Sequence, residues 1–164
     1  MFITRFSNSF INRLLLLLII ISPNMLYASD YIPRGYYVID LKNRVEWLTC
    51  TVGSTWEGNS CKGKPIKLKL DQVDEAISIA NEQLGGTWRL PNRTELENLV
   101  CHDCKIVKIN RKLFPGTPAE SFWTREKNNW QPQFNWTVNF FTGYTFGRFP
   151  GFIPNYVRLV RDRN

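Results

Sequence analysis

The sequence of 164 residues is poor in the groups that enzymes use for catalysis. It contains a single histidine, His102, and no serine or cysteine nucleophile stands at motif spacing from a base. Two acidic residues, Glu95 and Glu97, lie close together, but a helix-capping pattern already accounts for Glu95. We therefore expect a protein that is not an enzyme.

Long apolar runs, internal repeats and linkers are also missing. The longest apolar run, residues 14–21, is far shorter than the roughly twenty residues that a helix needs to cross a bilayer. After Gly35, no tract rich in Pro, Ser or Gly is long enough to separate two domains. With 43% hydrophobic and 21% charged residues, the chain has the composition of one folded domain.

The first residues have the order of a secretory signal peptide. Arg5 and Arg13 precede the apolar run, and Leu26, Tyr27 and Ala28 follow it. We predict a signal peptide at 1–28, a short lead-in at 29–34 and one domain at 35–164; an uncleaved anchor is the weaker alternative. The protein is then secreted, periplasmic or held at the cell surface, without a membrane span after cleavage.

Export changes the interpretation of the four cysteines, because an oxidising compartment converts thiols into disulfides. Cys50 and Cys61 enclose a polar loop whose closure stabilises a fold by about 3 kcal/mol. The pair Cys101 and Cys104 has the spacing of a structural disulfide, a redox pair or half a zinc site, and we favour the structural disulfide. We expect no metal ion and no other cofactor.

Hydrophobic periodicity and turn residues predict an α+β fold with two helices packed on short, mostly antiparallel strands. A helix should begin near Asp71 and end at Gly85, and Asn92 with Glu95 forms the capping box of a second helix that extends to about Val100. The predicted strands are 37–40 and 44–48, which form a hairpin, and 121–124, 135–141 and 155–161.

Seven motifs in register resemble the Lcl C-terminal domain, a bacterial domain related in fold to C-type lectins. They span about residues 36 to 161: Trp47, Cys50, Gly53, Trp56, Cys61 and Gly63; residues 88–91 with Glu95 and Leu96; Ile109 and Asn110; residues 114–118; residues 122–124; Trp136, Val138, Phe140 and Gly143; and residues 157–161. The resemblance implies a compact C-type-lectin-like domain of an adhesion or surface protein. Because residues 131–133 (Gln-Pro-Gln) offer no anionic oxygen, we expect no calcium site.

Two groups of residues are candidates for ligand binding. Aromatic residues alternate with amides and glycines between 125 and 156, a composition typical of binding loops, although a hairpin packed on itself would show the same pattern. A basic run near residue 105 and a net charge that falls from +7 to +5 when Arg5 and Arg13 are removed favour a polyanionic partner. The candidates are Trp130, Asn135, Tyr144 and Arg148 in the first group and Lys105, Lys108, Arg111 and Lys112 in the second.

These candidates predict a secreted or surface-exposed binding module. Its partner would be a glycan, a polyanion or a cell-surface protein, and no specific nucleic acid is expected. Two alternatives remain: a periplasmic thiol-disulfide or metal protein that uses Cys101 and Cys104, and a structural component of an envelope assembly.

Overall fold

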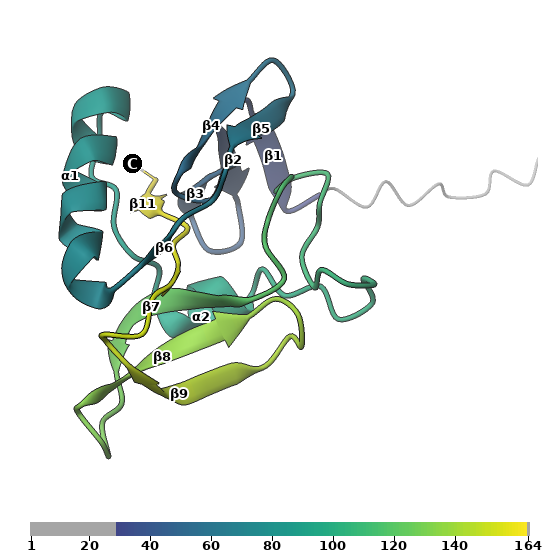
Figure 1. The fold of residues 1–164 in the computed structure, drawn as a ribbon. Coiled ribbons are helices and arrows are strands. Elements are labelled where there is room, and N and C mark those ends of the chain that lie inside the picture. Colours follow the sequence, from purple (N-terminus) through teal and green to yellow (C-terminus); the bar gives the residue numbers. More distant parts are fainter. Residues whose placement is uncertain (1–28, 164) are drawn as a thin grey trace, which may run out of the picture.

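A computed structural model describes residues 29–163 as two main sheets, a small hairpin and two helices (Figure 1). The predicted signal peptide, 1–28, lies outside the described residues. The four-stranded sheet has the order β1-β2-β3-β11 and is antiparallel throughout. Its strands are β1 (Tyr31–Arg34), β2 (Tyr37–Asp40), β3 (Val45–Leu48) and β11 (Val160–Asp162).

The five-stranded sheet has the order β6-β10-β7-β8-β9, and only β10 and β7 pair in parallel. Its strands are β6 (Lys67–Leu68), β10 (Asn155–Tyr156), β7 (Ser121–Lys127), β8 (Phe134–Asn139) and β9 (Thr145–Pro150). Strands β4 (Ser54–Glu57) and β5 (Ser60–Gly63) form a separate hairpin. Strands therefore outweigh helices in this α+β fold.

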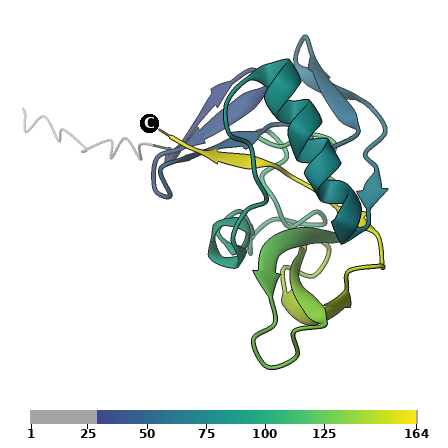
Figure 2. The same cartoon turned by 90° about the vertical axis from the view of Figure 1, so that its left-hand side faces the viewer.

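The longer helix, α1 (Val73–Leu84), follows a 3₁₀ turn, η1 (Leu70–Gln72), and turns Val73 and Ala80 toward the core. It ends where Gly85 takes φ = 67°, a conformation that glycine adopts without strain. Figure 2 shows α1 lying across the sheets, with its N-terminal end beside β7. The predicted helix and its stop are confirmed.

The shorter helix, α2 (Arg93–Glu97), begins with the predicted capping box. The Asn92 side chain accepts a hydrogen bond from the Glu95 backbone at 2.7 Å, and the Glu95 carboxylate accepts one from the Asn92 backbone at 2.7 Å. The helix ends at Glu97 instead of near Val100, because the backbone amides of Leu99 and Val100 bond only three residues back. The chain thus leaves the helix as a single tight turn.

Two clusters of buried side chains form the core. The first joins both sheets to α2, and the second packs α1 on Trp88 and Trp123. Of the five tryptophans in the family-like motifs, Trp47, Trp88 and Trp123 are buried, whereas Trp56 and Trp136 are only half-buried. Apolar side chains from both sheets thus pack against one another in the core, and the turns lie at the surface.

Three sequence-based boundaries differ from the structure. Residues 31–34 are not a lead-in: they form strand β1, which pairs with β2 along its whole length. The predicted strand 155–161 is divided between β10 and β11, because residues 157–159 turn into the core between two sheets. Strand β9 was not predicted, since its Gly147 and Pro150 are residues that usually end strands.

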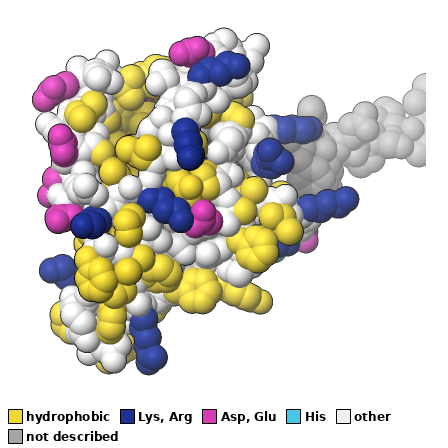
Figure 3. All heavy atoms as spheres, viewed as in Figure 1, with side chains coloured by type: hydrophobic (Ala, Val, Ile, Leu, Met, Phe, Trp, Pro, Cys, Tyr) yellow, Lys and Arg dark blue, Asp and Glu magenta, His cyan; other side chains and the backbone are white. Residues whose placement is uncertain are grey.

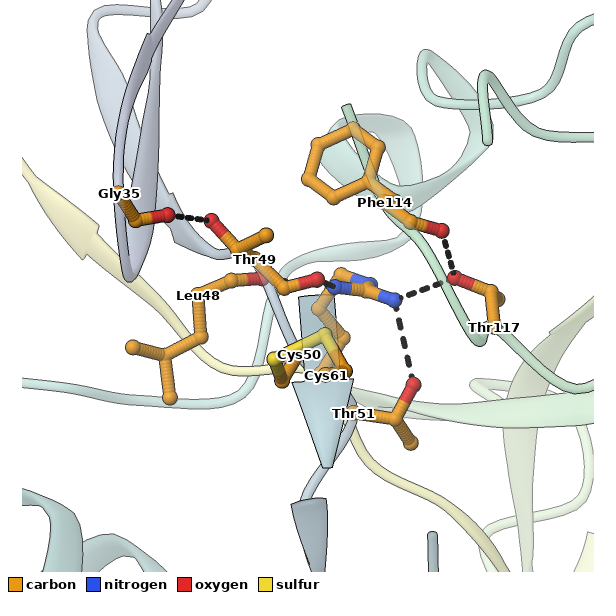
Figure 4. The surroundings of a disulfide bond; sticks show 9 residues. Gly35, Leu48, Thr49, Cys50, Thr51, Cys61, Phe114 and Thr117 are labelled. Carbon is orange, nitrogen blue, oxygen red and sulfur yellow. Dashed lines mark hydrogen bonds between the residues drawn. A yellow bond between two sulfur atoms is a disulfide. The ribbon is translucent and has the colours of Figure 1, made fainter. Parts of the chain in front are cut away.

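Both predicted disulfides are present, Cys50–Cys61 and Cys101–Cys104. The first joins the chain after β3 to β5, and Figure 4 shows it beside Thr49 and Thr51. Both threonines accept a hydrogen bond from the buried Arg158. Near the C-terminus, Arg161 pairs with the Glu46 carboxylate at 2.7 Å. Arg158 pairs with no carboxylate among residues 29–163 and donates only to backbone carbonyls and threonine hydroxyls. The sequence favours an ion pair for at least one of Arg158 and Arg161, and Arg161 makes it, with Glu46 and not with the expected Glu95 or Asp40.

Candidate functional site

The two most exposed aromatic candidates lie at opposite ends of β8. Trp130, with 85% of its surface exposed, is in the turn before β8, and Tyr144, with 68% exposed, is in the turn after it. A strand of six residues is about 20 Å long. These two side chains therefore belong to two separate surfaces.

The other two candidates of the 125–156 region differ in accessibility. Arg148 is exposed on β9, two residues after Phe146 and therefore on the same face of the strand. Asn135 is buried on β8, and the turn after β9 covers it: a Cβ at Gly151 would lie 3.7 Å from Asn135 Nδ2. A side chain so covered cannot contact a ligand directly, so the structure removes Asn135 from the candidate set.

The turn between β8 and β9 packs on the basic segment. The backbone amide of Lys108 donates a hydrogen bond to the Phe140 carbonyl at 2.7 Å. Gly143, at φ = 80°, approaches so closely that a Cβ there would lie 3.2 Å from Val100 and 3.7 Å from Lys108. This contact places two exposed aromatic rings, Phe141 and Tyr144, beside residues that follow Cys101.

Within the basic segment, Lys108 holds the backbone instead of facing solvent. Its Nζ donates hydrogen bonds to the carbonyls of His102 at 3.0 Å and of Cys104 at 2.6 Å. The Cys101 amide in turn donates to the Lys108 carbonyl at 3.0 Å. Lys108 thus closes the loop that the Cys101–Cys104 disulfide begins, and we correct its role from ligand contact to loop support.

The remaining cations are exposed and lie within four residues of Lys108, whose backbone amide bonds to the aromatic turn. Lys105 and Arg111 each lie three residues from Lys108 along the chain, and Lys112 follows Arg111. We name the combined area the turn–loop surface; it consists of Phe141, Tyr144, Lys105, Ile106, Arg111 and Lys112, all exposed. Seen from the side of Figure 3, apolar side chains gather over the lower sheet, β7 to β9. Of the predicted candidates, this surface contains one from the first group, Tyr144, and three from the second, Lys105, Arg111 and Lys112.

The sequence model of one family covers most of this chain: the Lcl C-terminal domain matches residues 36–161. The chain belongs to the Lcl C-terminal domain family. The matched range contains both disulfides and the entire turn–loop surface. No curated protein and no solved structure matches the chain. Family membership together with two disulfides fits a secreted or surface module.

The described residues of the Lcl C-terminal domain show neither a metal-binding cluster nor a membrane-spanning helix. Residues 29–163 contain no group of three His, Cys, Asp or Glu side chains arranged to hold a metal ion. In the same range, no helix is long and apolar enough to cross a bilayer.

A pocket of about 700 Å³ lies at the other end of the domain, where α1, β7 and the turn after β9 meet. Leu70, Val73, Ile77 and Leu90 form its apolar lining, and Phe152 stands at its edge with 68% of its surface exposed. Asp71, Asp74, Arg89 and Arg125 supply charge. The sequence analysis missed this pocket, because its charged residues come from three distant segments and match no motif.

Only one of the two arginines in this pocket is engaged by close carboxylates. Arg89 forms two hydrogen bonds of 2.9 Å with the Glu95 carboxylate and one of 2.5 Å with Asp162. The hydrogen bond from Arg89 lowers the pKa of Asp162. Arg125 has a single carboxylate contact, Glu126 at 3.9 Å, which is its neighbour in the chain. Arg125 is therefore the cation available to a ligand.

Proposed function

We propose that this Lcl C-terminal domain is a non-enzymatic binding module for an anionic glycan, exported to the cell surface or beyond and used in adhesion. The turn–loop surface is the binding site. The observation that carries the proposal is the hydrogen bond from Lys108 to Phe140, because it brings the aromatic turn against the basic segment. The C-type-lectin-like relationship implied by the sequence resemblance is part of this proposal.

The chemistry of the turn–loop surface supports a charged sugar polymer. Phe141 and Tyr144 offer exposed rings that can cover the apolar face of a sugar, and they lose little conformational entropy on binding. Lys105, Arg111 and Lys112 offer cations for sulfate or carboxylate groups. An anionic polysaccharide presents both chemistries at once.

The experiment is binding of the purified protein to immobilised sulfated and neutral polysaccharides at low and high salt. Replacing Lys105, Arg111 and Lys112 with alanine should weaken binding to the sulfated polymers about tenfold, since each exposed cation contributes about 0.5 kcal/mol. Tyr144→Ala should weaken binding further, and Trp130→Ala should not, because Trp130 lies beyond the far end of β8.

A charge-matched control separates a site from general electrostatic attraction. The exposed residues Lys62, Lys64 and Lys69 lie on other elements, and their replacement by alanine removes the same total charge. Equal loss in both triple variants would contradict the turn–loop surface. Absence of binding to every anionic polymer would contradict the anionic-glycan proposal itself.

A thiol-disulfide function of Cys101 and Cys104 is the second candidate. The two residues are joined in the structure, and the Cys104 carbonyl accepts from Lys108 Nζ, an arrangement that suits a structural loop. Changing both cysteines to serine should abolish dithiol turnover in a redox enzyme. In a binding module the same change should weaken the affinity for the glycan, and neither the unmodified protein nor the variant should show dithiol turnover.

A further inference from the structure

We propose that the pocket between α1, β7 and the turn after β9 binds a short apolar peptide with free termini. Arg125 would bind the carboxylate of the peptide, and Asp71 and Asp74 its ammonium group. The pocket lies at the end of β8 opposite to the turn–loop surface, because the turn that carries Phe152 follows Pro150, which pairs with Phe134. The inference does not depend on the proposed glycan site.

The shape and lining of the pocket suit a small ligand. A volume of about 700 Å³ lies within the range of known small-molecule sites, roughly 300 to 1,000 Å³. Val73 and Leu90 are almost fully buried and form a preformed floor. The backbone amide of Leu70 donates to the Gly151 carbonyl at 2.9 Å, which holds the turn bearing Phe152 over the start of the helix. An apolar side chain can thus be covered without rearrangement of the backbone.

The free charges of the pocket come from different elements. The carboxylates of Asp71 and Asp74 accept no hydrogen bond and form no ion pair with any residue in the range 29–163. Asp74 lies in the first turn of α1, where it suits the helix dipole, and Asp71 lies in the preceding turn η1. The cation of the pocket that is free for a ligand, Arg125, belongs to β7. The complementary ligand carries one cation and one anion.

A peptide with free termini fits these features better than other small amphiphiles do. A fatty acid would occupy the apolar floor and Arg125, but its chain would cover two carboxylates without neutralising them, which is unfavourable. A polyamine would leave Arg125 without a partner. A short peptide of apolar residues has an ammonium, a carboxylate and apolar side chains between them.

The test is titration calorimetry of the full protein with trileucine, with N-acetyl-trileucine and with trileucine amide. We expect measurable binding of trileucine and about tenfold weaker binding of each capped form, because each cap removes one charge-assisted hydrogen bond. Absence of heat at millimolar trileucine would overturn the proposal. Equal affinity for all three peptides would overturn it as well, since the charges would then have no role.

Variants test which charged residues of the pocket bind each terminus of the peptide. Arg125→Gln should weaken trileucine binding about tenfold and leave the affinity for trileucine amide unchanged. The double variant Asp71→Asn with Asp74→Asn should also weaken trileucine binding about tenfold, but it should leave the affinity for N-acetyl-trileucine unchanged. Arg148→Gln, an exposed change outside the pocket, is the matched control and should alter nothing. Loss of affinity for all three peptides in both pocket variants would contradict the assignment. The comparison of capped peptides on the unmodified protein needs no variant, so it stands even if a variant misfolds.

Discussion

The guanidinium of the buried Arg158 donates a hydrogen bond of 2.6 Å to the backbone carbonyl of Thr49, the residue before Cys50. Figure 4 shows Thr49 and Thr51 beside the Cys50–Cys61 disulfide. The other acceptors of Arg158 are the carbonyl of Leu48 and the hydroxyls of Thr51 and Thr117, and the Phe114 ring lies 4.7 Å away. Burial lowers the pKa of Arg158 to about 9. One cation thus joins the chain after β3 to the loop before β7 through neutral acceptors alone.

We expect Arg158→Lys to lower the free energy of unfolding by about 2–4 kcal/mol. A lysine ammonium is a compact donor and cannot reach both the carbonyls and the two hydroxyls, so buried acceptors lose their partners. Urea denaturation measures the change. Arg148→Lys, at an exposed position, should stay within about 0.5 kcal/mol of the unmodified protein; a similar small loss at Arg158 would contradict its structural role.

The ion cluster around Arg89 should make the fold sensitive to acid. Burial alone would raise the pKa of Glu95, but hydrogen bonds from Arg89 and the Asn92 backbone outweigh it, and the pKa is lowered from 4.5. Because the folded pKa is below the unfolded one, this stabilisation is present above about pH 4.5 and is lost as the pH falls through the folded pKa.

Glu95→Gln should therefore lower stability at pH 7 and flatten the decline of stability between about pH 5 and pH 3. Urea midpoints measured at several pH values in that window give the slope for each protein. Equal slopes in Glu95→Gln and the unmodified protein would show that Glu95 does not contribute to the acid sensitivity.

Gly147 is needed because the Trp136 ring lies across β9. A Cβ at Gly147 would stand 2.6 Å from the ring, and the ring also carries the Arg93 guanidinium at 4.6 Å. Gly147→Ala should cost about 1–3 kcal/mol of stability through overpacking. Combining it with Trp136→Leu should cost less than the sum of the two single changes, because the smaller side chain removes the clash. Additive losses would argue against the contact.

Lys108 should control how well the disulfide loop is held. In Lys108→Met the carbonyls of His102 and Cys104 lose their common donor, so we expect trypsin to cut after Lys105 several times faster than in the unmodified protein. Lys112→Met, which removes an exposed lysine from the same segment, is the control and should leave that rate unchanged. The rate is read from the appearance of the two fragments under non-reducing conditions.

Several features of this domain are determined by the sequence alone, since they depend on neighbours along the chain. Asn92 and Glu95 cap a helix from three residues apart, Gly85 ends α1 by its own backbone freedom, and the hairpin at residues 37–48 follows from alternation around a polar turn. The family follows in the same way, because its motifs are local and appear in a fixed order. The pairing of the four cysteines was also predictable, since both disulfides close short loops.

The accessibility of the candidate residues was decided only by the tertiary structure. Asn135 is buried because Gly151 covers it, Lys108 is engaged because the backbone of its own loop folds back on it, and Trp130 and Tyr144 are separated because β8 stands between them. The pocket likewise needs α1, β7 and the turn after β9 to meet. A local pattern predicts which face of a strand or helix is polar, but the packing of distant segments determines which polar groups stay free for a ligand.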